Sequence, residues 1–126
     1  MAADAYLKVA AGQLQQAATA VKQDADHIRA ELATFKHQAE HDINSMQTLA
    51  QVRRVEADRA KDEPANYNAI MAHVAKLEHD INEKKQELAK RTSEAEQKIR
   101  GKEGAVQGIA SQAQGLQRQA SDPNLK

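Results

Sequence analysis

Apolar residues recur at alternating steps of three and four along nearly the whole chain. In the first half these positions are Leu7, Ala11, Leu14, Ala18, Val21, Ala25, Ile28, Leu32, Phe35, Ala39, Met46, Leu49 and Val52. In the second half they are Ile70, Val74, Leu77, Ile81, Leu88, Ala95, Ile99, Val106, Ile109, Ala113, Leu116 and Ala120. This spacing is typical of heptads and not of the strict alternation of a strand. It predicts two long amphipathic helices.

The pattern is interrupted at Asp62, Glu63 and Pro64. Proline lacks a backbone N–H and restricts the residue before it, but it is tolerated in the first turn of a helix. A connection this short makes the two helices antiparallel neighbours. The sequence therefore predicts an all-α chain, a long antiparallel two-helix coiled-coil hairpin. We expect a single domain over residues 1–126, with helices at 4–61 and 65–120, a turn at 62–64 and a flexible tail at 121–126.

Folding the chain back at the Glu63–Pro64 bond often places a large apolar residue opposite an alanine. Ala11 then faces Leu116, and Ala39 faces Leu88. Complementary sizes are what a close-packed interface between two helices requires. The same register places Asp42 opposite Lys84, and we interpret these two as a structural ion pair that disfavours slipped registers.

Two glycines, Gly101 and Gly104, lie inside the second predicted helix, where each is less favourable than alanine by about 1 kcal/mol. A break or hinge at this point is one interpretation. A continuous helix is the other, and we favour it because the apolar positions from Val106 to Leu116 keep the same register with the first helix.

Composition narrows the range of functions. The chain has 126 residues, of which 40% are hydrophobic and 29% charged, with two Tyr, one Phe and no Trp. Eighteen basic residues balance eighteen acidic ones, so the net charge does not favour nucleic acid. The segment 84–102 is locally basic, but no aromatic residues interleave with its charges for base stacking. We therefore expect no nucleic-acid partner and no small-molecule substrate.

Candidate chemistry is sparse. His37 and His41 are four residues apart, a spacing that can chelate a metal on one helical face. Histidines exposed on a helix are the interpretation that we favour, and a metal site is the weak alternative. Cysteine is absent, which excludes disulfides and thiolate ligands. No catalytic pattern of two carboxylates or of Ser, His and Asp stands out, so we expect no enzyme and no cofactor.

These observations favour a non-enzymatic structural or protein-protein interaction protein, a hairpin acting as spacer, adaptor or assembly subunit. Val9, Val55 and Met71 lie outside the predicted interface and are the candidate contacts for a protein partner or for self-association. An amphipathic protein that binds a lipid or hydrophobic granule surface is the alternative. Its apolar face would be poor in large residues, which disfavours a membrane surface as partner.

The N-terminal residues lack the basic start and the apolar run of a classical signal peptide, and no segment reaches the apolar length of a membrane span. We therefore expect a soluble, cytoplasmic protein, with leaderless secretion as the alternative. The size and the hairpin loosely resemble the small helical-hairpin substrates of type VII secretion. Those proteins carry a Trp-x-Gly turn, whereas this turn reads Glu63-Pro64-Ala65-Asn66-Tyr67. The resemblance implies a small secreted helical-hairpin substrate as a further alternative.

Overall fold

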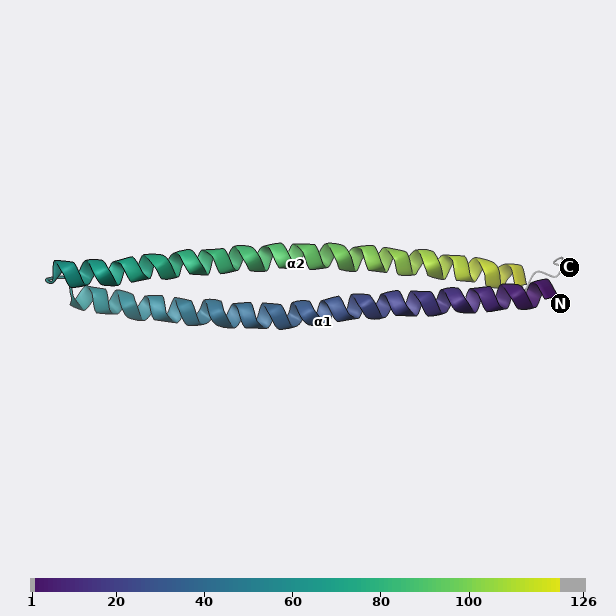
Figure 1. The fold of residues 1–126 in the computed structure, drawn as a ribbon, viewed down its shortest axis with the longest axis horizontal. Coiled ribbons are helices and arrows are strands. Elements are labelled where there is room, and N and C mark those ends of the chain that lie inside the picture. Colours follow the sequence, from purple (N-terminus) through teal and green to yellow (C-terminus); the bar gives the residue numbers. More distant parts are fainter. Residues whose placement is uncertain (1, 121–126) are drawn as a thin grey trace. The chain divides into compact units, whose positions relative to one another are not determined.

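The computed structural model of the chain describes residues 2–120, and these form two long helices without a strand (Figure 1). Helix α1 spans Ala2–Arg59 and helix α2 spans Pro64–Ala120. The two helices pack against each other, which confirms the prediction of an all-α helical hairpin. The expected helix limits lie within two residues of those observed, and the expected tail at 121–126 lies outside the described residues.

Backbone hydrogen bonds close the turn between the helices. The N–H of Ala60 donates to the carbonyl oxygens of Glu56 and Ala57 at 3.1 and 3.0 Å, and the N–H of Glu63 donates to the carbonyl of Ala60 at 2.9 Å. Helix α2 begins at Pro64, where the missing N–H of proline would have no partner in the helix. The carbonyl of Glu63 accepts the first bond of α2, from the N–H of Tyr67 at 2.8 Å.

The chain divides into two compact units, and both are built from the same two helices. One unit comprises residues 32–93 and contains the turn. The other combines the residues up to Glu31 with those from Glu94 onward. Within each unit, a stretch of α1 packs on a stretch of α2.

In the unit of residues 32–93, small residues of α1 meet large residues of α2. The buried apolar residues are Ala39, Ile43, Ala50, Ala57, Ala60, Val74, Leu77 and Ile81. Four of the five on the α1 side are alanines, whereas the three from α2 are all branched aliphatics. This distribution agrees with the expected pairing of large with small residues. Small side chains on one helix leave room for large ones on the other, which is what close packing requires.

The other unit buries fewer of its described residues, and most of them are alanines. Ala11 and Ala25 of α1 and Ile99 and Ala113 of α2 are buried. Two ion pairs link α1 to α2 beside these buried residues. Arg29 pairs with Glu103, and the Nζ of Lys102 lies 3.7 Å from Oδ2 of Asp24.

Helix α2 is continuous through Gly101 and Gly104, so the structure has no break at these two residues. Neither glycine would bring an added Cβ within 4 Å of another heavy atom outside its own part of the helix. Both glycines lie on the exposed surface of α2. Their cost is therefore a matter of helix propensity and not of packing.

The expected interface is wrong at one place in α1. Leu49 and Val52 were expected to face α2, but they are 42% and 48% exposed, and Ala50 and Ala57 are buried instead. The cause is a pair of four-residue steps from Phe35 through Ala39 to Ile43, which moves the buried face onward by one residue. Such an insertion in a heptad pattern changes which residues face the partner helix.

Candidate interaction surfaces

Three large apolar side chains of α1 lie at the surface of the unit of residues 32–93. Leu49, Val52 and Val55 are 42%, 48% and 44% exposed, and together they are called here the α1 stripe. Each step of three residues rotates the side chain by about 60° around the helix. The α1 stripe therefore winds from the edge of the helix interface at Leu49 to the side of α1 that points away from α2 at Val55.

A partly buried cluster of hydrogen-bonded polar side chains lies beside the α1 stripe. The Nε of Arg53 donates to Nδ1 of His73 at 3.0 Å, which joins α1 to α2. The Nη1 of the same guanidinium donates to Oε2 of Glu56 at 2.7 Å. Because residues three and four apart are neighbours on a helix, Arg53 borders Leu49 and Glu56 borders Val52. The α1 stripe is thus an apolar surface that is bordered by polar side chains, and these are hydrogen-bonded to one another.

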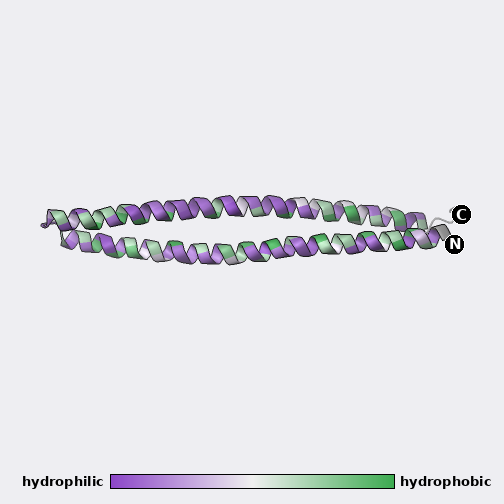
Figure 2. Ribbon diagram, in the orientation of Figure 1, coloured by the Kyte–Doolittle hydropathy of each residue, from purple (hydrophilic) through white to green (hydrophobic). Residues whose placement is uncertain are grey.

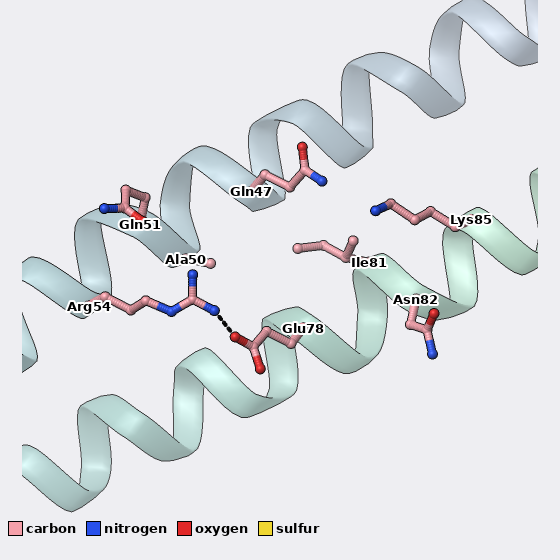
Figure 3. Close-up of a pocket in the computed structure, with 8 residues that line it drawn as sticks. All are labelled: Gln47, Ala50, Gln51, Arg54, Glu78, Ile81, Asn82 and Lys85. Atoms are coloured by element: carbon pink, nitrogen blue, oxygen red, sulfur yellow. Dashed lines mark ion pairs between the residues drawn. The ribbon is translucent and has the colours of Figure 1, made fainter.

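A groove lies between α1 and α2 on the other side of the interface (Figure 3). Its volume is about 530 Å³, and its lining residues are Gln47, Ala50, Gln51, Arg54, Glu78, Ile81, Asn82 and Lys85. Ala50 and Ile81 form the apolar part, and the ion pair between Arg54 and Glu78 crosses from one helix to the other. The groove is open and its polar groups do not converge on one point, unlike those of an enclosed catalytic pocket.

A smaller hollow of about 270 Å³ lies near the turn. Tyr67 and Met71 of α2 line it opposite Ala57 and Asp58 of α1, together with Lys61. The Lys61 ammonium lies 2.9 Å from Oδ1 of Asp58. This hydrogen bond, followed by the attraction of the Asp58 charge, raises the pKa of Lys61 above its ordinary value. Lysine is therefore held in its charged form, which is not the state of a general base.

The three residues named as partner contacts do not share one surface. Val55 is exposed within the α1 stripe, whereas Met71 is half-buried and lines the hollow near the turn. Val9 is 60% exposed and belongs to the other compact unit.

Asp42 and Lys84, named as a structural ion pair, face each other across the helix interface. The Nζ of Lys84 lies 3.6 Å from Oδ2 of Asp42, and both residues are half-buried. A similar contact lies nearby, where the Arg91 guanidinium is 4.3 Å from the centre of the Phe35 ring. Both contacts join the helices in the expected register.

His37 and His41 are both exposed on α1. Across residues 2–120, no three His, Cys, Asp or Glu side chains come together in a group that could hold a metal ion. The two histidines form at most an incomplete ligand set.

Comparisons with protein-family models, with curated proteins and with solved structures found no match to this chain. Hydrophilic and hydrophobic residues are interspersed along both helices, and the middle of α2 is mainly hydrophilic (Figure 2). Neither helix, over its described length, has a stretch apolar enough to cross a membrane.

Leu49 and Val52 are surface residues that the sequence interpretation missed, because it assigned the largest apolar residues to the helix interface. A second signal was available. Ile43, Ala50 and Ala57 recur every seven residues, and an apolar position repeated every seven residues is compatible with helix packing. Choosing this repeat for the interface leaves Leu49 and Val52 at the surface.

Proposed function

We propose that this protein is a non-enzymatic interaction protein, a coiled-coil hairpin that binds a protein through the α1 stripe. In this role it acts as a spacer, an adaptor or a subunit of an assembly. The observation that carries the proposal is that part of α1 buries mainly small side chains and exposes large apolar ones. Ala39, Ala50 and Ala57 occupy most of the buried face, while Leu49, Val52 and Val55 remain at the surface.

The energetic argument begins with the core. Of the twelve buried apolar residues in the described part of the chain, seven are alanines, and Val74 is the largest side chain with less than 2% exposure. Burial stabilises in proportion to apolar area, so an alanine contributes much less than a leucine. Long helices depend on such packing for their stability. A partner that covers the α1 stripe would add the burial of large side chains that the hairpin itself does not use.

The proposal also holds that the protein catalyses no reaction. Among the described residues, the groove and the hollow near the turn are open, and ion pairs join Arg54 with Glu78 in the groove and Lys61 with Asp58 in the hollow. Open surfaces whose polar groups do not converge on one point differ from the pockets that hold a small substrate.

Photo-crosslinking in the native cell tests the proposal. A photoreactive phenylalanine analogue replaces Val52 in one variant and Gln51, which lies on the groove side, in the control. We expect the variant at Val52 to form defined protein adducts that are at least several times stronger than those of the control. Adducts with lipid alone would favour the surface-binding alternative, and equal labelling at both positions would contradict the proposal.

A further inference from the structure

One of the five histidines joins the two helices. His73 of α2 is half-buried, whereas the other four histidines are exposed. The Nδ1 atom of His73 accepts a hydrogen bond of 3.0 Å from the Nε of Arg53 on α1. His27 and His79, by contrast, lie 2.8 and 3.0 Å from a glutamate four residues along their own helix. His73 is therefore the histidine to examine for an effect on the packing of α1 against α2.

The hydrogen bond between Arg53 and His73 needs the neutral form of the imidazole. A neutral imidazole has one nitrogen that donates and one that accepts, and here Nδ1 accepts, so the ring proton is on Nε2. In an imidazolium both nitrogens carry protons, and neither can accept a hydrogen bond. Protonation of His73 would therefore remove this bond and would leave two positive charges beside each other in a half-buried position.

The charged groups around His73 come from both helices. On α1, Arg53 contacts the imidazole directly, and Glu56 accepts a hydrogen bond of 2.7 Å from Nη1 of the same guanidinium. On α2, Lys76 lies three residues further along, which is a neighbouring position on the helix surface. Two of these three groups are cations, and the one carboxylate is already bound to Arg53. An imidazolium would therefore meet like charge from both helices.

From this geometry we propose that Arg53 and His73 form an acid-sensitive link between α1 and α2, which is lost when His73 takes up a proton. Histidine is the side chain whose charge ordinarily changes between about pH 5 and pH 8. Stability rises with pH wherever the unfolded chain binds more protons than the folded one, and the folded chain can protonate His73 only by giving up the bond from Arg53. Acid therefore weakens the packing of the two helices beside the α1 stripe. This link belongs to the fold and is independent of any partner on the stripe.

Urea unfolding at about pH 8 and about pH 5 tests the link by comparing the wild-type chain with His73→Asn. The side-chain oxygen of asparagine can take the place of Nδ1 and accept from Arg53, but asparagine does not titrate. Between the two pH values we expect the urea midpoint of the wild type to fall by about 0.5 M more than that of His73→Asn, the effect of one hydrogen bond to a charged group in a small protein. The other four histidines are the same in both chains, so the difference reports His73. Equal falls, or a larger fall for His73→Asn, would overturn the proposal.

Two further variants are matched controls. His41→Asn makes the same change at an exposed position of α1, and its midpoint should fall with pH as much as that of the wild type. Arg53→Met keeps the aliphatic part of the side chain but removes the donor of the hydrogen bond. In the Arg53→Met background, His73→Asn should no longer change the response to pH. If His73→Asn still changes it by the same amount, Arg53 is not the partner and the link is wrong.

Nitrogen-15 NMR of the wild-type chain keeps the proposal testable even if the variants unfold. The chemical shifts of the two imidazole nitrogens show which of them carries the proton. At about pH 8 we expect His73 to carry its proton on Nε2, with Nδ1 unprotonated and accepting from Arg53. A proton on Nδ1 at this pH would contradict the hydrogen bond and with it the acid-sensitive link.

Discussion

Replacing Ile43 and Val52 with alanine, one at a time, distinguishes the buried face of α1 from its exposed face. Ile43 is 7% exposed, and its truncation removes three carbon atoms from the interface with α2. At about 0.8 kcal/mol per buried methylene, the transfer free energy is about 2.4 kcal/mol, and the cavity left behind adds to it. The higher helix propensity of alanine offsets this loss of stability by about 0.4 kcal/mol. We therefore expect Ile43→Ala to lower the free energy of unfolding by about 2–4 kcal/mol.

Val52→Ala gives the contrasting result. Val52 is 48% exposed, so the loss of two carbon atoms costs about 0.8 kcal/mol, and alanine returns about 0.6 kcal/mol through helix propensity. The net effect is close to zero. The assay is urea unfolding followed by circular dichroism, at a chain concentration of about 1 µM so that association adds little to the measured stability. Equal costs for the two changes, or a larger cost for Val52→Ala, would refute the buried face described for α1.

Two further predictions concern α2 and its contact with α1. Gly101→Ala and Gly104→Ala should each raise the free energy of unfolding by about 0.5–1 kcal/mol, because an added Cβ meets no neighbour within 4 Å at either position. Thermal melts with Gln107→Ala as an exposed control check this, and a lower melting temperature would show that the glycine face is packed. Asp42→Lys should cost on the order of 1 kcal/mol by placing like charges together, and adding Lys84→Asp should restore most of it. Equal stability of the single and double variants in urea would mean that the two sites are uncoupled.

The sequence was sufficient to predict the hairpin because two strong local signals agree. The heptad spacing defines both helices, and Pro64 starts the second at the position where its missing donor does no harm. The register follows from size complementarity, and the contact between Asp42 and Lys84 lies where that register places it.

The α1 stripe was harder to predict, since spacing alone allows two faces in this part of α1. One face carries Leu49 and Val52, and the other carries Ala50 and Ala57. Ranking residues by hydrophobicity selects the first, whereas close approach to the large Leu77 and Ile81 of α2 selects the second. The groove could not be predicted either, because its walls depend on how Arg54 and Glu78 place their side chains across the interface.

A thiol-reactivity scan of α1 tests the central claim most directly, namely that α1 buries Ile43, Ala50 and Ala57 and presents the α1 stripe at its surface. Single variants Ile43→Cys, Leu49→Cys, Ala50→Cys and Val52→Cys are feasible because the chain has no other cysteine. In dilute solution we expect the variants at 49 and 52 to react with a maleimide at least about ten times faster than those at 43 and 50, since access controls the rate at each site. In urea the four rates should become equal. Slow reaction at 49 and 52 together with fast reaction at 43 and 50 would contradict the account.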